Sequence, residues 1–355
     1  MSHDLLTLTE QLCAIPSVSG DEAAIDDLVE ARLRASSARL KVERIGANVV
    51  ARTELGRDRR IVLGGHLDTV PANGNQEPRR DGDVLHGLGT ADMKGGLAVL
   101  LALADDLSNG RARFDVTIVL YDGEEVAEEH NGLRRLFAEA PGLVQGDLAV
   151  MLEPTGGWVE AGCQGTIHVR AGFDGVRSHS ARPWMGKNAI HRAAGLLDRC
   201  ARFEAATVDV DSLEYREALQ VVRIEGGVAN NVVPDHCALV INRRYAPSRP
   251  LAEAVAEVVG FCTDAGADHV DVLNASPAAP PNLSNALIAE MIGVYDLPVR
   301  PKLGWTDVAR FAAHGIPACN FGPGDPELAH TPDERVDRAN LDACLGLLEA
   351  FVGIT

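Results

Sequence analysis

The sequence lacks several features that mark well-known classes of protein. Its seven cysteines are odd in number and include no C-x-x-C pair, which excludes a disulfide framework and a zinc finger. It has no run of about 18 apolar residues, so we expect no membrane-spanning segment. The first residues, MSHDLLTLTE, have no signal-peptide pattern. Together these absences predict a protein of the reducing cytoplasm.

Positive charge is also scarce. Lysine and arginine number 33 against 51 aspartates and glutamates, which gives a net charge of −18. Nucleic acids and anionic membranes both attract basic surfaces, so we expect neither as a partner. Two interpretations of the acidity stay open: plain solubility, or carboxylates gathered to hold cations.

Strands and helices alternate over the first part of the chain. With 355 residues, 46 % of them hydrophobic, the chain has room for about two domains. Apolar runs predict strands over 48–52, 60–64, 114–121 and 148–152. Helical spacing of apolar residues predicts helices over 4–14, 22–35, 95–107 and 131–138. Strands that are apolar throughout and separated by helices are typical of an α/β domain with a mostly parallel sheet.

The middle of the chain has a different pattern. Strands are predicted over 166–172, 219–225, 237–245 and 267–273, and helices over 188–203 and 251–264. The order β-α-β-β-α-β is the ferredoxin-like arrangement. Further elements follow a Pro-rich linker, with helices over 285–295, 308–314 and 340–352 and a strand over 318–321. We therefore predict an α/β domain of residues 1–165 and 277–355, interrupted by an α+β domain of residues 166–276.

Candidate metal ligands follow the predicted strands. His66 and Asp68, in GGHLDTVP, come directly after the strand over 60–64, and a carboxylate beside a histidine can orient a metal-binding imidazole. The alternative is a polar loop with no function. Asp92 lies in the glycine-rich segment GTADMKGG before an apolar helix. Its negative charge argues against phosphate binding and favours a carboxylate that is directed into a pocket.

Two adjacent glutamates follow the strand over 114–121. Residues next to each other on a strand face opposite sides, so Glu124 and Glu125 can share a pocket only where Gly123 breaks the strand. Two crowded carboxylates are stable when one binds a cation and the other acts as a general base. A solvated acidic loop is the alternative. Glu153 follows the strand over 148–152, and His330 precedes the last helix.

The combination is more informative than any single motif. Ligands in open α/β sheets bind at the carboxyl ends of the strands, where these residues are expected. Two histidines and three carboxylates suit two divalent ions bridged by one carboxylate. The absence of cysteine from the set favours Zn²⁺, with Co²⁺ or Mn²⁺ as possible substitutes.

The motifs HLDTVP, GTADMKGG, YDGEE, EPTGG and AHTPDE, in this order, resemble the M20 family of di-zinc amidohydrolases. The resemblance implies a zinc-peptidase-like catalytic domain with an inserted lid and dimerisation domain. It implies that one zinc is held by His66, Asp92 and Glu153. It implies that the other is held by Asp92, Glu125 and His330. Glu124 would be the general base, and Asp68 would orient His66.

Several stretches resemble the actinobacterial type of succinyl-diaminopimelate desuccinylase within that family, among them RSHSARPWMGKNAIH and GVANNVVPD. That branch hydrolyses N-succinyl-LL-2,6-diaminopimelate to succinate and LL-2,6-diaminopimelate, in lysine and diaminopimelate biosynthesis. The resemblance implies a homodimer in which His179 stabilises the oxyanion in the partner subunit's site. It further implies substrate contacts from Asn231, Arg244, Gly304 and Thr306.

One stretch departs from the proteobacterial form of that branch. Cys163, Gln164, Gly165 and Thr166 stand where that form has Arg-Arg-Gly-Ser, so recognition of one substrate carboxylate is expected to differ. Two other hypotheses stay open. The chain could be another deacylase or carboxypeptidase with the same chemistry, such as an acetylornithine deacetylase, or a metal-binding protein without catalytic activity.

Overall fold

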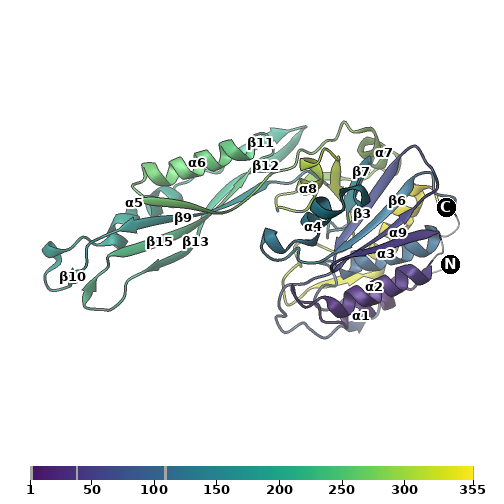
Figure 1. Cartoon of the computed structure of the whole chain (residues 1–355), viewed down its shortest axis with the longest axis horizontal. Coiled ribbons are helices and arrows are strands. Elements are labelled where there is room, and N and C mark those ends of the chain that lie inside the picture. The colour runs from purple at the N-terminus through teal and green to yellow at the C-terminus, as the bar shows by residue number, and fades with distance from the viewer. Residues whose placement is uncertain (1–2, 37–38, 108–109, 355) are drawn as a thin grey trace. The chain divides into compact units, whose positions relative to one another are not determined.

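The structure is a computed structural model that describes residues 3–36, 39–107 and 110–354 (Figure 1). The predicted domain ends at residues 1 and 355 lie outside the described residues. The chain divides into two compact units, which are described separately below. The first comprises Met1–Ala161, Asn282–Arg300 and Arg310–Thr355, and the second comprises Gly162–Pro281 and Pro301–Ala309. The assignment of these units to catalysis and to a lid stays a prediction.

An eight-stranded sheet forms the centre of the first unit, in the order β1-β2-β6-β3-β7-β18-β8-β17. The four neighbours β6, β3, β7 and β18 run parallel, as predicted. The pairs β1–β2, β2–β6 and β18–β8 are antiparallel. The strands are β1 (Leu40–Ile45), β2 (Asn48–Thr53), β3 (Arg60–His66), β6 (Asp115–Tyr121), β7 (Leu148–Met151), β8 (Val159–Ala161), β17 (Val299–Pro301) and β18 (Ala318–Asn320).

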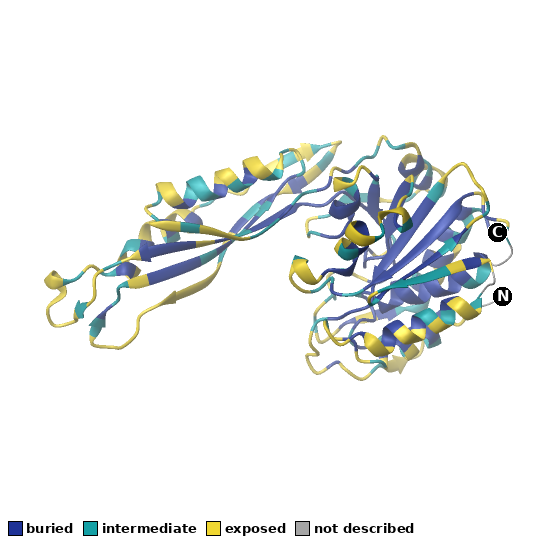
Figure 2. Cartoon of the chain, viewed as in Figure 1, coloured by how far each residue is buried: buried dark blue, intermediate teal, exposed yellow. Residues whose placement is uncertain are grey.

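Helices cover this sheet. Helix α3 contacts α1, α2 and α9 as well as β3, and all residues from Lys94 to Ala104 are buried (Figure 2). Helix α4 packs against β2, and the rings of Phe137 and Phe311 connect it to α8. The helices are α1 (Leu5–Cys13), α2 (Ala23–Ser36), α3 (Lys94–Asp106), α4 (Gly132–Glu139), α7 (Ala286–Tyr295), α8 (Val308–Ala313) and α9 (Arg338–Val352). A small sheet joins β4 (Arg79–Asp81), β5 (Val84–His86) and β19 (Arg335–Asp337).

The second unit is built on a four-stranded sheet in the order β13-β15-β9-β16. Its neighbouring strands are antiparallel, and helices α5 and α6 pack against the sheet. This order matches the predicted ferredoxin-like arrangement. The elements are β9 (Gly165–Asp174), α5 (Ala189–Ala201), β13 (Ala218–Gly226), β15 (His236–Tyr245), α6 (Leu251–Asp264) and β16 (His269–Ser276). Two further strand pairs join β10 (Ser178–His179) to β14 (Val232–Val233) and β11 (Thr207–Val210) to β12 (Leu213–Arg216).

Within the eight-stranded sheet, the sequence interpretation overlooked strand β1 and the short strands β8 and β17. Strand β1 mixes charged and apolar residues and is mostly half-buried, so it carries no apolar run. Strands β8 and β17 have three residues each, too few for a periodic signal. Within the described residues, no helix has both the length and the apolar content that a bilayer crossing requires.

Candidate metal centre

Three parallel strands bring the predicted ligands of the first unit to one edge of the sheet. His66 is the last residue of β3 and pairs with Tyr121 at the end of β6. Gly64 pairs with Met151 at the end of β7, so all three strands end together. The glutamates at positions 124, 125 and 153 follow directly after β6 and β7. This is the carboxyl edge, where open α/β sheets bind their ligands.

Two glycines allow the chain to turn closely at this edge. Gly123 has φ of +66°, and a Cβ there would lie 2.5 Å from the carbonyl oxygen of His130. The strand therefore breaks before Glu124, as the sequence predicts. Gly96 lies in the first turn of α3, where a Cβ would meet the carbonyl oxygen of Leu152 at 2.5 Å. A side chain at this position would separate the helix from the end of β7.

The predicted ligands form overlapping groups of potential metal donors. The ligand atoms of His66, Asp92 and Glu153 lie within 4.8 Å of one another, and we call these residues the first donor group. The second donor group, with the same spacing, consists of Asp92, Glu125 and His330. Asp92 belongs to both groups. A third set combines His66 with Glu124 and Glu125, so Glu124 lies within reach of the same centre.

Asp92 directs its two oxygens toward different histidines. Its Oδ1 lies 3.0 Å from Nε2 of His66, and its Oδ2 lies 3.4 Å from Nε2 of His330. Burial raises the pKa of Asp92, but hydrogen bonds from His330 and His66 more than offset this and keep the pKa well below its usual value. A carboxylate with one oxygen toward each donor group has the geometry of a bridging ligand. The donor set therefore fits two divalent cations.

His66 is held between two carboxylates and is almost completely buried. Its Nδ1 atom lies 2.9 Å from the carbonyl oxygen of Asp68 and 3.4 Å from Oδ1 of that residue. Burial lowers the pKa of His66, but hydrogen bonds to Asp68 and Asp92 raise it well above its ordinary value. Contacts on Nδ1 leave Nε2 facing the centre, as a histidine ligand requires.

Asp68 also holds the loop that carries the two glutamates. Its Oδ1 accepts the backbone N–H of Glu124, and its Oδ2 accepts that of Glu125, both at 3.0 Å. Ser19 donates to Oδ2 at 2.6 Å. Burial raises the pKa of Asp68, yet hydrogen bonds from His66 and Ser19 lower it to about 2.

His330 reaches this centre from a distant segment. Its Nε2 atom lies 2.8 Å from Oε1 of Glu125. Hydrogen bonds to Asp92 and Glu125 raise the pKa of His330 to about 10. The residue has φ of +63°, in the left-handed region that few non-glycine residues adopt. Neighbouring contacts must hold the backbone in this conformation.

Two residues of the centre were missed by the sequence interpretation. Ser19 donates to Asp68, and Glu334 accepts the backbone N–H groups of Ala91 and Asp92. Burial raises the pKa of Glu334 to about 7. The motif that contains His330 also contains Glu334, which was the available signal. No pattern identifies Ser19, because its role depends on the packing of a loop 49 residues away in sequence.

The remaining predicted site residues lie in the second unit, in two places. His179 and Asn231 are together: His179 pairs with Val232 between β10 and β14, and Ser180 donates its N–H to the carbonyl oxygen of Asn231 at 2.9 Å. The His179 side chain is exposed, and its Nδ1 accepts the N–H of Ala181 at 3.0 Å.

The second group of predicted residues lies near the start of β9 and consists of Arg244, Gly304 and Thr306. Arg244 pairs with Thr166 at the start of β9. The carbonyl oxygen of Thr306 accepts from Sγ of Cys163, so this loop also lies near the start of β9. Arg244 contacts Oδ1 of Asn242 at 3.2 Å. Within the described residues, no carboxylate lies at ion-pair distance from the Arg244 guanidinium.

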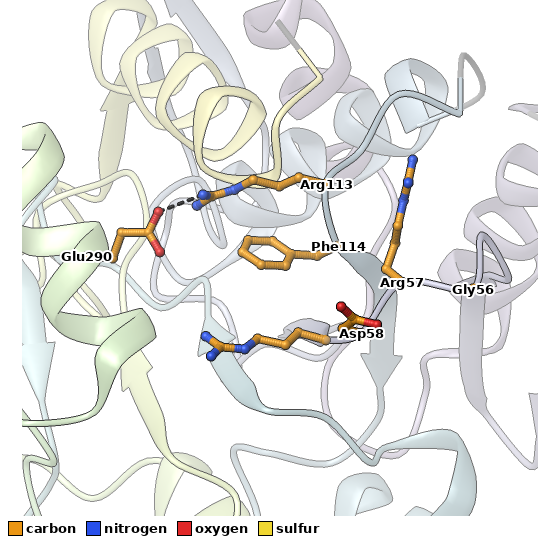
Figure 3. Close-up of a pocket in the computed structure, with 7 residues that line it drawn as sticks. Gly56, Arg57, Asp58, Arg113, Phe114 and Glu290 are labelled. Atoms are coloured by element: carbon orange, nitrogen blue, oxygen red, sulfur yellow. Dashed lines mark hydrogen bonds and ion pairs between the residues drawn. The ribbon is translucent and has the colours of Figure 1, made fainter.

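A cavity of about 510 Å³ in the first unit has a different location. Residues 56–59, which precede β3, line it together with Arg113, Phe114 and Glu290 (Figure 3). His66 is at the far end of β3, about 20 Å along the strand from residue 60. Arg113 donates to Glu290 at 2.6 Å and lies over the ring of Phe114. This cavity is therefore not the pocket of the donor groups.

The comparisons with known proteins agree with this geometry. Residues 62–353 match the family described as Peptidase family M20/M25/M40. The match includes every donor residue and covers most of the chain. The chain therefore belongs to the M20 peptidase family, a class that includes hydrolases of amide bonds.

Several curated relatives extend over the full chain. A Mycobacterium tuberculosis protein with the name DapE is 47 % identical over 99 % of this chain and 98 % of its own length. The succinyl-diaminopimelate desuccinylase of Corynebacterium glutamicum is 42 % identical over 98 % of this chain and 96 % of its own length.

Solved structures show the same fold. A tripeptidase from Staphylococcus aureus superposes with a TM-score of 0.82 at 22 % identity, covering 99 % of this chain and 97 % of that chain. A Bacillus subtilis protein described as a dinuclear metal-binding peptidase of the M20 family superposes with a TM-score of 0.70 at 16 % identity, covering 99 % and 96 %.

Proposed function

We propose that this protein hydrolyses N-succinyl-LL-2,6-diaminopimelate to succinate and LL-2,6-diaminopimelate, a step of lysine and diaminopimelate biosynthesis. The observation that carries the reaction class is the pair of donor groups that share Asp92, with Glu124 next to them. The substrate is supported by the full-length relatives, one of which is named as a desuccinylase at 42 % identity.

The two donor groups would hold two cations, which we propose to be Zn²⁺, with Co²⁺ or Mn²⁺ able to replace them. Imidazole and carboxylate donors without thiolate fit these metals. When bound, such cations polarise an amide carbonyl and lower the pKa of water. The first donor group would hold one cation, the second donor group the other, and Asp92 would bridge them.

Glu124 would act as the general base of the reaction. It would take a proton from the attacking water and deliver it to the leaving amine, so one carboxylate serves both steps. Asp68 supports this role by fixing the backbone N–H of Glu124 at 3.0 Å. The carboxylate of Asp68 also orients His66, so one buried residue positions both a metal ligand and the general base.

The second unit would supply the contacts to substrate. The planar guanidinium of Arg244 suits a substrate carboxylate, and Gly304 and Thr306 lie at the same end of the unit. His179 would donate to the oxyanion that develops on the amide, and Asn231 beside it would contact the substrate.

A homodimer would bring both sets of contacts to one site. Val232, the partner of His179, precedes β15, whereas Arg244 lies near the end of that strand. Eight residues separate His236 from Arg244, which corresponds to roughly 26 Å along the strand. One small substrate therefore does not reach Arg244 and His179 of the same chain. Val222 and Ile224 on β13, an edge strand of this sheet, are exposed and suit a contact between copies.

Substrate preference tests the proposal. The zinc-loaded protein is assayed for amine release from N-succinyl-LL-2,6-diaminopimelate, N-acetylornithine, simple N-acylamino acids and small peptides. We expect the succinylated substrate to have the highest kcat/KM. A clear preference for acetylornithine or for peptides would assign the chain to another branch of the family. No release from any of them would point to a metal-binding protein without this activity.

Mixing experiments test the dimer. Variants His179→Ala and Glu124→Gln are each expected to lose most activity. A heterodimer of the two has one site in which both residues are intact, so mixing and exchange of subunits should restore part of the activity. An inactive mixture with proven exchange would place His179 in the site of its own chain.

The seven buried, unpaired cysteines suit the cytoplasm, which we propose as the location.

A further inference from the structure

One buried carboxylate of the first unit has no assigned role. Glu334 is 1 % exposed, and its Oε1 atom accepts the backbone N–H groups of Ala91 and Asp92, both at 3.0 Å. These donors lie 242 or more residues away in sequence. A carboxylate that accepts two backbone N–H groups holds their peptide planes more firmly than a neutral acceptor does.

The main chain of Glu334 is joined to the same loop. Its carbonyl oxygen accepts the N–H of Gly87 at 3.0 Å, so both ends of the loop over 87–92 are attached to one residue. Asn75 adds a second link, because its side chain donates to the carbonyl oxygen of Thr331 and its own carbonyl oxygen accepts the N–H of Leu88.

These contacts connect two donor residues that the chain itself leaves far apart. His330 precedes Glu334 by four residues and adopts a left-handed backbone conformation that needs support from its surroundings. Asp92 is the residue common to both donor groups. A small shift of the loop over 87–92 against the segment over 330–334 would therefore change both groups at once.

We propose that Glu334 is a positioning residue of the metal centre: it fixes the loop of Asp92 against the segment of His330, so that both donor groups form together. This inference depends on the metal centre of the proposed function but not on the identity of the substrate. Groups that orient metal ligands typically change metal affinity by about ten- to a hundredfold when removed.

Three substitutions separate positioning from general stability. Glu334→Ala removes the acceptor of both N–H groups and leaves them buried. Glu334→Gln keeps an oxygen in the place of Oε1, so it should retain both hydrogen bonds in weaker form. Glu334→Asp is one methylene shorter and should reach at most one of the two N–H groups.

Asp115 offers a matched control in the same unit. It is a buried carboxylate that accepts the backbone N–H groups of Leu55 and Arg57 at 2.7 and 2.9 Å. It is the first residue of β6, at the edge of the sheet opposite to the donor groups. Asp115→Ala should therefore lower the melting temperature as Glu334→Ala does, without an effect on metal binding.

The test is metal binding by the full chain, measured without substrate. Titration with Zn²⁺ gives the affinity and stoichiometry, and the visible spectrum of the Co²⁺-loaded protein reports the ligand geometry. We expect Glu334→Ala to bind metal about ten- to a hundredfold more weakly with an altered cobalt spectrum. Glu334→Gln should keep the cobalt spectrum of the wild type, and Asp115→Ala should bind metal as the wild type does.

Other results would overturn the proposal. If Glu334→Ala binds both ions with wild-type affinity and spectrum and differs only in melting temperature, Glu334 has a purely structural role. Should the alanine variant not fold, wild-type binding and spectra in both Glu334→Asp and Glu334→Gln would lead to the same conclusion. If the wild-type protein binds no metal, the donor groups do not form a metal centre, and Glu334 has no such centre to position. Failure to hydrolyse the succinylated substrate affects only the proposed function, because no substrate enters this test.

Discussion

The Oδ1 atom of Asp68 accepts the backbone N–H of Glu124 at 3.0 Å. The same side chain accepts from Glu125 and lies 3.4 Å from Nδ1 of His66. One buried carboxylate thus joins the end of β3 to the loop after β6. This arrangement makes the position of the proposed base depend on a residue that need not touch the substrate.

Replacement of Asp68 should therefore impair catalysis more than folding. We expect Asp68→Asn to lower kcat by about ten- to a hundredfold, because the amide keeps one acceptor oxygen but not two. Ser19→Ala is the matched control, since it removes one hydrogen bond to Asp68 and leaves the others. It should lower kcat by less than Asp68→Asn does. Equal kcat in wild type and Asp68→Asn would show that the loop holds its position without this carboxylate.

Glu124 and Glu125 are adjacent, but their substitution should have different effects on activity and on metal binding. Glu124→Gln should lower kcat by about 10²- to 10⁴-fold, the usual contribution of a general base, and keep two bound metal ions. Glu125→Gln should lose affinity for one ion, because Glu125 belongs to the second donor group. Activity assays and metal analysis on the same preparations separate the two. Loss of an ion in Glu124→Gln would instead make Glu124 a ligand, within the third set of donors.

The adjacent arginines of β15 give a second pair of contrasting substitutions. Arg243 is buried and donates to Glu217 at 2.6 Å, whereas Arg244 has no carboxylate at ion-pair distance within the described residues. Arg243→Ala should lower stability, because it removes one of the two arginines that pair with the buried Glu217. The cost should stay below the about 3–5 kcal/mol of a buried charge without a partner, since Arg249 remains 3.0 Å from this carboxylate. Arg244→Ala should fold normally and raise KM. Denaturant unfolding and steady-state kinetics check the two. An unchanged KM in Arg244→Ala would exclude it from binding the substrate carboxylate.

The sequence predicted which polar residues lie at the edge of the sheet, but it did not predict all the contacts that hold them there. The parallel strands β3, β6 and β7 each contain a run of apolar residues. The ends of these strands, and the polar residues that follow them, could therefore be predicted. His330 was assigned only through a family motif, because no local pattern brings residue 330 beside residue 92. The cis peptide bond between Asp92 and Met93 has no sequence signature, since neither residue is proline.

Removal of metal should destabilise the first unit. The donor groups crowd carboxylates of like charge into a partly buried space, and bound cations would offset this repulsion. Treatment with a chelator should lower the melting temperature, and added Zn²⁺ should restore it. The gain is about 2.7 kcal/mol when free metal is about 100 times its Kd. Scanning calorimetry with Zn²⁺, Co²⁺ and Mn²⁺ ranks the metals. A melting temperature that no metal changes would argue against a centre at these residues.

Asp26 predicts a pH dependence that is separate from the metal centre. Its side chain is 2 % exposed, and its ion pair with Arg44 is long, at 3.5 Å. Burial raises the pKa of Asp26 to about 7, although Arg44 opposes the shift; nearby negative charges that add to it include Asp122 and Glu22. An unfolded aspartate has a pKa of about 3.9. Between these values the folded state binds more protons than the unfolded state, so this contribution to stability is complete below about pH 4 and is lost as the pH rises through about 7.

Asp26→Asn should therefore match the wild type in stability below about pH 4 and exceed it by a margin that grows up to about pH 7 and is constant above that, because the amide needs no proton. Arg44 keeps its partners Asp27 and Glu30, at 2.5 and 3.0 Å, so loss of the Asp26 charge leaves it paired. Asp27→Asn is the control: this side chain is 73 % exposed, and its substitution should give a melting temperature difference that does not grow with pH. Melting temperatures measured from pH 5 to 8 check both variants. A constant difference between Asp26→Asn and wild type across this range would show that Asp26 is ionised throughout it, in contrast to what its burial predicts.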